Sequence, residues 1–170
     1  MKGYVQVYTG NGKGKTTAAI GLAIRSVGAG KKVYIAQFVK GLKYSEIKSL
    51  EKIENIDVEQ FGLKCFITDK PKQEDIVVAQ KGLEQVRLIS MSEKYDVIIM
   101  DEANIAVYFK LFSVDDLLDI IKNKNDKIEL VITGRYADPK LVEQADLVTE
   151  MKEIKHYYNK GVEARQGIES

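Results

Sequence analysis

Apolar residues gather along the chain in short runs that are rich in β-branched and aromatic side chains. Each short run is typical of a β-strand. These runs predict strands over residues 4–8, 32–38, 56–61, 95–100, 128–133 and 146–151. The longer stretches between them have helical spacing and predict helices over residues 16–27, 73–91, 113–122 and 139–145. Strands and helices in alternation favour a parallel sheet joined by helical crossovers.

Signals at the ends of these segments agree with the predicted boundaries. Gly28 and Gly30 follow the first helix, and Ser113 and Asp116 have the spacing of a capping box. Residues 62–72 show no clear period, so we expect a loop there. We expect residues 155–170 to form a polar surface extension.

Length and composition change this picture little. The chain has 170 residues, 45% of them hydrophobic, which fits a single domain over residues 1–170. The formal net charge of +1 gives no sign of a nucleic-acid partner. No stretch approaches the roughly 18 to 20 apolar residues of a membrane span, and no secretory signal is visible, so we expect a soluble protein without a membrane partner. The single cysteine, Cys65, excludes an internal disulfide and fits the cytoplasm.

The sequence TGNGKGKTTAA lies between the first predicted strand and the first predicted helix. A glycine-rich turn at that point lets backbone N–H groups face an anion, most often phosphate, at the helix N-terminus. The usual pattern G-x-x-x-x-G-K-[ST] is matched at Gly14, Lys15 and Thr16, but Thr9 stands at its first position. The sequence therefore predicts a variant phosphate-binding loop. Its binding residues are Thr9, Gly10, Asn11, Gly12, Lys13, Gly14, Lys15, Thr16 and Thr17.

The residue types in this loop suggest separate roles. Lys15 is expected to reach the phosphate oxygens as a catalytic residue, and Lys13 adds a second charge. The hydroxyl of Thr16 is expected to ligate magnesium or manganese. As an exposed loop lysine, Lys15 is expected to contribute little to stability. With this loop, the expected fold is α/β: a three-layer, P-loop NTPase-like (RecA-like) domain with helices on both faces of a mostly parallel sheet.

Charged residues follow two other predicted strands. Asp101 and Glu102 end the run YDVIIMDE, at the carboxyl edge of a parallel sheet, where ligands bind. One carboxylate is expected to hold the metal through water and the other to orient a nucleophile or support a metal ligand, which makes Glu102 a second catalytic candidate. A solvated acidic pair is the alternative. Arg135, in VITGRY, reaches the same edge as a phosphate or carboxylate contact, or else forms a surface salt bridge.

Five motifs in order, TGNGKGKTTAA, QFVKG (residues 37–41), DE, TGR and the closing KHYYNKGVEARQGIE, resemble the ATP:corrinoid adenosyltransferases of the CobA/BtuR type. The resemblance runs nearly end to end. It implies that a Co(I) corrinoid attacks the 5′ carbon of ATP, forming a cobalt–carbon bond and releasing inorganic triphosphate. In the family the nucleotide lies in the reverse direction to that in other P-loop proteins, and Lys13, Lys15, Thr16 and Thr17 match its motif.

The resemblance also implies partners. ATP and a corrinoid, either cobalamin or cobyrinic acid a,c-diamide, are the substrates, a flavoprotein is a candidate electron donor, and a homodimer is expected. The family's loop after the third strand carries aromatic residues over the corrin, and Phe66 corresponds to a tryptophan that this chain lacks. Cys65 beside it is interpreted as a bystander. His156 matches a histidine of the family's tail, with a surface or interface role equally open.

Three other functions compete with this interpretation. A RecA-like ATPase would use Glu102 to polarise water and would release ADP and phosphate. A small-molecule kinase usually brings several arginines to the phosphates, and this chain has few. A non-catalytic nucleotide or corrinoid carrier would bind without turnover. None of the three explains the combination of the glycine loop, QFVKG and the C-terminal motif.

Overall fold

The computed structural model describes residues 2–42, 44–63 and 70–169. Within these residues six strands form one open sheet in the order β3-β2-β4-β5-β1-β6, and every neighbouring pair is parallel. The strands are β1 (Val5–Thr9), β2 (Val33–Phe38), β3 (Ile56–Phe61), β4 (Val97–Asp101), β5 (Glu129–Thr133) and β6 (Leu147–Glu150). The predicted α/β class and the six predicted strands are confirmed.

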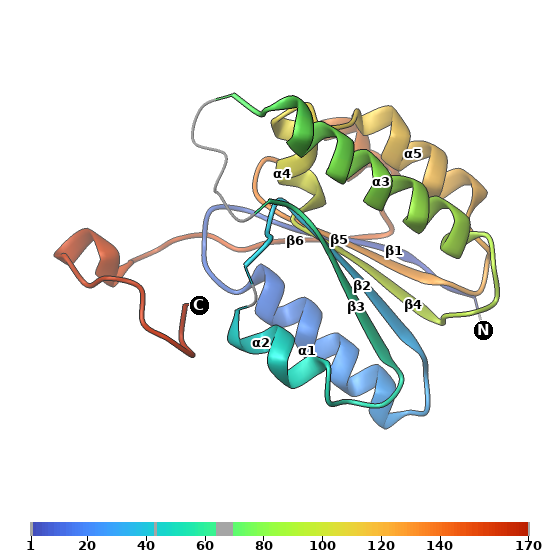
Figure 1. The fold of residues 1–170 in the computed structure, drawn as a ribbon, viewed down its shortest axis with the longest axis horizontal. Coiled ribbons are helices and arrows are strands. Elements are labelled where there is room, and N and C mark those ends of the chain that lie inside the picture. Colours follow the sequence, from blue (N-terminus) through green and yellow to red (C-terminus); the bar gives the residue numbers. More distant parts are fainter. Residues whose placement is uncertain (1, 43, 64–69, 170) are drawn as a thin grey trace.

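Helices connect the strands and cover both faces of the sheet (Figure 1). They are α1 (Lys15–Gly28), α2 (Ser45–Leu50), α3 (Gln73–Ser90), α4 (Ala103–Tyr108), α5 (Val114–Asn123) and α6 (Pro139–Gln144), followed by the 3-10 helix η1 (Tyr157–Lys160). Helices α1 and α2 lie on one face, and α3, α4 and α5 lie on the other. The three layers match the predicted architecture.

The predicted helices are present, but two short α-helices were missed, as was the 3-10 helix η1. Ser113 and Asp116 form the predicted capping box at the start of α5, where each side chain accepts a hydrogen bond from the other residue's backbone. The missed helices, α2 and α4, have six residues each, too few to show a helical period. No helix among the described residues is long and apolar enough to cross a membrane.

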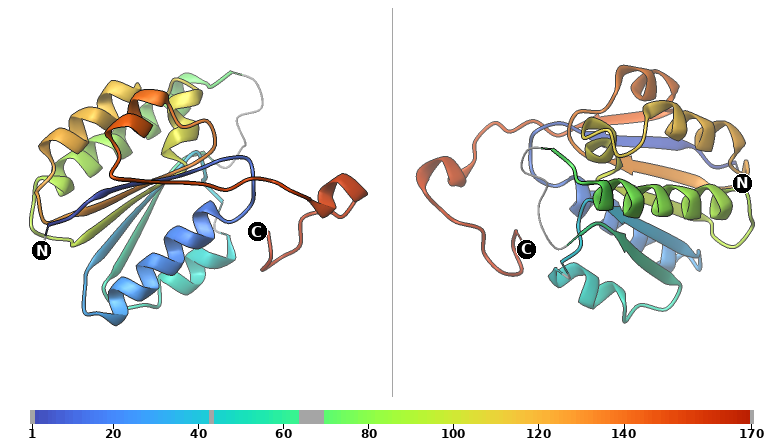
Figure 2. Two further views of the ribbon diagram at one scale, coloured as in Figure 1. Left: turned by 180° about the vertical axis from the view of Figure 1, so that it is seen from behind. Right: turned by 45° about the horizontal axis from the view of Figure 1, so that its top comes forward.

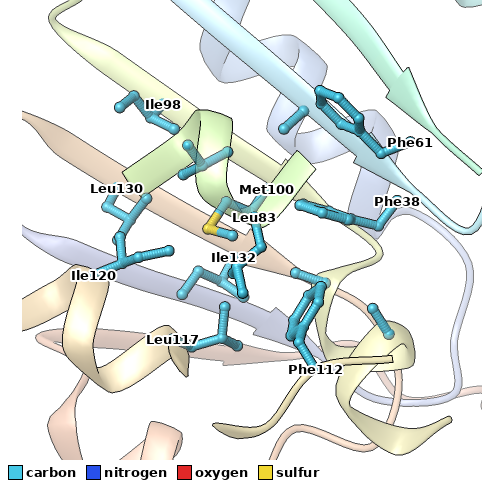
Figure 3. Close-up of a cluster of buried hydrophobic side chains, with 14 of the residues drawn as sticks. Phe38, Phe61, Leu83, Ile98, Met100, Phe112, Leu117, Ile120, Leu130 and Ile132 are labelled. Atoms are coloured by element: carbon cyan, nitrogen blue, oxygen red, sulfur yellow. The ribbon is translucent and has the colours of Figure 1, made fainter. Parts of the chain in front are cut away.

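The core lies on both sides of the central strands, which explains their almost continuous apolar sequences. Every residue of β2 and β4 is buried. On β2, Ala36 and Phe38 belong to the cluster beneath α3 and α5, whereas Val33 and Ile35 belong to the cluster beneath α1. Figure 3 shows Phe38 in the first cluster together with Met100, Ile132, Leu83, Leu117 and Ile120.

The parallel sheet brings the carboxyl ends of its strands to one edge, which is where the site residues emerge. Strand β5 lies between β1 and β4, so β1, β5, β4 and β2 end side by side. In the register of the sheet, Gln37 on β2 is opposite Asp101 on β4, and Tyr8 on β1 is opposite Thr133 on β5. The ends of β1, β2, β4 and β5 thus form a common platform.

The chain after β6 leaves the body of the fold and turns back towards the start of α1 (Figure 2). Most of this segment is exposed, as expected for a surface extension. Its end nevertheless contacts the glycine loop, because Lys13 Nζ donates a 2.8 Å hydrogen bond to the carbonyl of Ile168. The prediction of a surface extension did not include this contact.

Candidate nucleotide-binding site

The glycine loop between β1 and α1 packs closely against the chain that follows β6. Gly12 N donates a 2.7 Å hydrogen bond to Met151 O, and Met151 N donates one of 2.8 Å to Thr9 O. A Cβ on Gly10 would lie 2.4 Å from Met151 O, and a Cβ on Gly12 would lie 2.8 Å from the backbone of Lys152. Gly10 also has a φ of 94°, which only glycine adopts readily. These two glycines are therefore required by the approach of a neighbouring backbone.

Lys15 is the first residue of α1, and its side chain folds back into the loop. It is 7% exposed, and its Nζ donates hydrogen bonds of 2.8 Å to both Gly10 O and Gly12 O. Burial holds the pKa of Lys15 below its usual value. The expectation of an exposed lysine was wrong, because the loop carbonyls offer the ammonium two acceptors inside the turn.

Asp101, at the end of β4, accepts four side-chain hydrogen bonds. Its Oδ1 accepts from Thr16 Oγ1 at 2.8 Å and from Thr133 Oγ1 at 2.7 Å. Its Oδ2 accepts from Gln37 Nε2 at 3.0 Å and from Lys40 Nζ at 3.2 Å. Burial alone would raise the pKa of Asp101, but the Lys40 charge and these hydrogen bonds hold it below its usual value. The carboxylate is therefore ionised although it is only 1% exposed.

Glu102 follows Asp101 but has different surroundings. Its φ of 59° places it in the left-handed region, and its backbone N donates a 3.0 Å hydrogen bond to Thr133 Oγ1. Its carboxylate lies 3.9 Å from Lys40 Nζ. Burial and the adjacent Asp101 charge raise the pKa of Glu102 above its usual value, despite the nearby cations. The acidic pair thus combines a firmly ionised carboxylate with one that takes up a proton more readily.

Arg135 follows β5 and is exposed. The turn that carries it is fixed by Asn104 of α4, whose Nδ2 donates a 3.0 Å hydrogen bond to Gly134 O. Arg135 forms no ion pair with the carboxylates in the described part of the chain. The surface salt bridge that was one alternative for Arg135 is thus not seen among the described residues, and the contact with a phosphate or carboxylate stays a prediction.

A cavity of about 660 Å³ opens over these groups, a volume typical of a small-molecule site. Its walls come from the glycine loop, α1, α2, the ends of β2, β4 and β5, and the C-terminal segment. The lining residues are Asn11, Gly12, Lys13, Gly14, Lys15, Thr16, Thr17, Ile20, Lys40, Ser45, Glu46, Ser49, Glu102, Arg135, His156, Gly167, Ile168 and Glu169. Three predicted residues, Thr9, Gly10 and Asp101, do not line it and support the wall from behind.

The C-terminal segment closes one side of the cavity with a carboxylate. Glu169 Oε1 lies 3.2 Å from Lys13 Nζ. Arg165 donates to the same carboxylate from its backbone and its guanidinium, and the Tyr157 hydroxyl also bonds to it. Hydrogen bonds from Arg165 and Tyr157 hold the pKa of Glu169 well below its usual value. Lys13 therefore already has an anionic partner within the chain.

Residues 1–170 match the family described as ATP:corrinoid adenosyltransferase BtuR/CobO/CobP. The chain belongs to this family. It is 34% identical to the corrinoid adenosyltransferase of Sinorhizobium sp over 99% of its length and 80% of that relative. It is 29% identical to the one of Escherichia coli K12, over 99% and 86%, and 31% identical to the one of Pseudomonas aeruginosa, over 99% and 84%.

Membership of the adenosyltransferase family decides between the predictions made from the sequence. It confirms the resemblance and the P-loop-like character of the fold, and it favours the adenosyltransferase over the RecA-like ATPase. Two predictions about the corrin side, the role of Phe66 and that of Cys65, fall on residues outside the described part of the chain.

Two site residues of this adenosyltransferase family member, Gln37 and Lys40, were not assigned a role from the sequence. Both lie in QFVKG at the carboxyl end of β2, where they contact Asp101. The argument that identified Asp101 at the end of β4 applies equally to polar residues at the end of β2. Their position at the end of a strand was thus a sufficient signal to predict both as site residues.

The oxygen donors of the site are those that magnesium prefers: the hydroxyl of Thr16 and the carboxylates of Asp101 and Glu102. Within the described ranges no group of three or more His, Cys, Asp or Glu side chains is placed to hold a metal ion. Magnesium commonly keeps several waters and binds through one or two protein oxygens together with substrate phosphates. The donor set fits such an ion bound jointly with a nucleotide.

Proposed function

We propose that this protein transfers the 5′-deoxyadenosyl group of ATP to the Co(I) centre of a corrinoid. The cobalt electron pair forms the bond to the 5′ carbon, the bond from that carbon to oxygen breaks, and triphosphate leaves with the electron pair of the broken carbon–oxygen bond. One observation carries the proposal: in a chain that matches the adenosyltransferase family end to end, the glycine loop opens onto a cavity of about 660 Å³.

The proposed role of the glycine loop is to bind the triphosphate and stabilise its departure. Lys13 and Lys15 both line the cavity, and the N-terminus of α1 adds its partial positive charge. Negative charge develops on the bridging oxygen as the bond to carbon breaks, so fixed cations beside it favour the transition state over the ground state. Lys15 is the catalytic residue of this group, supported by its fixed position among the loop carbonyls.

Magnesium or manganese would be held by the Thr16 hydroxyl and by Glu102 at the cavity wall, with Asp101 behind them. Both Asp101 oxygens already accept two hydrogen bonds each, so this carboxylate fits a role through Thr16 or through water. When bound, the ion neutralises charge on the triphosphate. Glu102, which lines the cavity, would orient the ion and its water ligands.

The chain itself has little acid–base chemistry to perform. A Co(I) corrinoid is already a strong nucleophile, so the protein needs to bind, align and shield two substrates. Arg135 lies at the cavity rim, where it fits a phosphate contact.

The proposal extends to Phe66 as a corrin contact, to a homodimer, to a flavoprotein as the electron donor for Co(II), and to the cytoplasm as the location. Cobalamin and cobyrinic acid a,c-diamide are the candidate acceptors.

The test is anaerobic incubation of the protein with ATP, magnesium and chemically reduced Co(I) cobalamin, followed by the absorbance of the cobalt–carbon product. We expect the product to form with the unmodified chain and not with Lys15→Ala. Substitution of an exposed lysine away from the cavity, Lys81→Ala, is the matched control and should leave the rate unchanged. ATP consumption without any cobalt–carbon product would reject the proposal in favour of an ATPase.

A further inference from the structure

Lys40 stands in a loop with a constrained backbone at the carboxyl end of β2. The preceding residue, Val39, has a φ of 63°, a left-handed conformation that a β-branched residue rarely adopts. Gly62 packs so closely against this loop that a Cβ there would lie 2.4 Å from Lys40 N. A strained conformation persists only where its surroundings enforce it, and it commonly marks a functional position. The base of the Lys40 side chain is therefore fixed in place.

The ammonium of Lys40 lies among the oxygen atoms proposed to serve the metal. Its Nζ is 3.2 Å from Asp101 Oδ2, 3.4 Å from Thr16 Oγ1 and 3.9 Å from Glu102 Oε1. Its side chain is 21% exposed and lines the cavity, so part of this side chain also faces the ligand space. Lys40 thus touches the metal-side oxygens and the ligand space at once.

Charge explains why a lysine is needed at this point. Asp101 and Glu102 are adjacent and mostly buried, and two neighbouring carboxylates disfavour each other's ionised form. The other donors to Asp101 are the uncharged side chains of Thr16, Thr133 and Gln37. Within the described part of the chain, Lys40 is the cation that forms ion pairs with both carboxylates. It offsets charge that would otherwise push these groups apart.

We propose that Lys40 is a positioning residue that exchanges partners during nucleotide binding. It acts as the counter-ion of Asp101 and Glu102 until a divalent cation takes that role, and it then turns its ammonium to the triphosphate. A metal ion and an ammonium repel each other over the same oxygens, and the flexible lysine stem allows a short movement into the cavity. This inference rests on the proposed use of ATP with a divalent cation.

The test compares the affinities for two ligands, which the loss of Lys40 should change in opposite directions. For Lys40→Met, Mn²⁺ alone, followed by electron paramagnetic resonance, should bind about tenfold more tightly, because the competing ammonium is gone. Tripolyphosphate added to the Mn²⁺-saturated protein, followed by calorimetry, should bind about tenfold more weakly, because the charged contact that Lys40 makes after the exchange is lost. Lys40→Gln, which keeps a hydrogen-bond donor to Asp101, should show the same pair of shifts if the methionine variant fails to fold.

Lys48→Met is the matched control, since Lys48 is exposed on neighbouring α2 and does not line the cavity. It should change neither affinity. If the Lys40 variants bound both ligands with unchanged affinity, or if both affinities shifted in the same direction, the exchange would be overturned and the proposed function would still stand. Failure of the unmodified protein to bind ATP with Mn²⁺ would instead overturn the proposed function, and the exchange with it.

Discussion

The hydroxyl of Thr16 donates a 2.8 Å hydrogen bond to Oδ1 of Asp101, a residue 85 positions further along the chain. This bond joins the first turn of α1 to the end of β4. Because the Thr133 hydroxyl donates to the same oxygen at 2.7 Å, the end of β5 is tied to them as well. The glycine loop and the acidic strand end are therefore held in one fixed arrangement.

Replacing Thr16 with valine should separate these two parts of the site. The substitution keeps the shape of the side chain but removes the hydroxyl donor to Asp101. We expect magnesium-dependent ATP binding to weaken about tenfold and the free energy of unfolding to fall by about 1 kcal/mol, the usual contribution of one such hydrogen bond. Calorimetry and urea unfolding measure the two effects. Thr16→Ser keeps the hydroxyl, and an equal loss in that variant would contradict the explanation.

Lys15→Ala should abolish ATP use. Lys15 is the buried cation at the centre of the glycine loop, and its Nζ is fixed by the carbonyls of Gly10 and Gly12. Removing a preorganised charge that stabilises the leaving group should lower kcat/KM by about 100-fold or more. Lys13→Ala should cost less, because Lys13 is more exposed and already shares its charge with Glu169. Equal losses in the two variants would argue against separate roles.

Gly12→Ala should disturb the loop through the chain behind it. The added Cβ would meet the backbone of Met151 and Lys152 at 2.8 Å, so one of the two segments must move. We expect a loss of about 1 to 3 kcal/mol in the free energy of unfolding and weaker ATP binding. Gly21→Ala is the control: it lies on the exposed side of α1 with open space around it and should stabilise the protein by about 0.5 to 1 kcal/mol. If Gly12→Ala and Gly21→Ala both destabilised the protein, the contact of Gly12 with the neighbouring backbone would not be the cause.

The stability of the protein at acid pH should depend on Asp101. The pKa of this carboxylate lies below its usual value in the folded protein, so its ionised form stabilises the fold. That contribution is complete above the ordinary aspartate pKa, about 4, and is lost as the pH falls through the lower folded value. Asp101→Asn should cost about 3 kcal/mol at pH 7 and clearly less at pH 3. Urea unfolding of both proteins at pH 7 and pH 3 measures this difference. An equal loss of unfolding free energy at the two pH values would contradict the prediction.

Sequence patterns predicted the part of the site that depends on local signals and on parallel strands. The glycine loop is a continuous segment before a helix, and Asp101 and Glu102 directly follow an apolar run. Because parallel strands end at the same edge of a sheet, the glycine loop and this acidic pair had to lie at one edge. Helix α4 could not be found in this way, because it has six residues and the residue before it, the left-handed Glu102, gives no capping signal.

The remaining features depend on contacts between distant segments. Lys13 and Glu169 are 156 positions apart, and no local pattern indicates that the C-terminal segment returns to the loop. The burial of Lys15 depends on where the loop carbonyls point, which the sequence alone does not fix. Lys40 was within reach of the strand-end argument, but a lysine there is typical of ordinary surface as well.

The most direct test of the proposed reaction is phosphorus NMR of the products of one anaerobic turnover, with ATP, magnesium and a Co(I) corrinoid in equal amounts. Attack at the 5′ carbon predicts intact inorganic triphosphate, one equivalent for each adenosylated corrinoid, and no ADP. Attack by water at phosphorus would give ADP and phosphate. That second result would contradict the adenosyl transfer and identify the glycine loop as part of an ATPase.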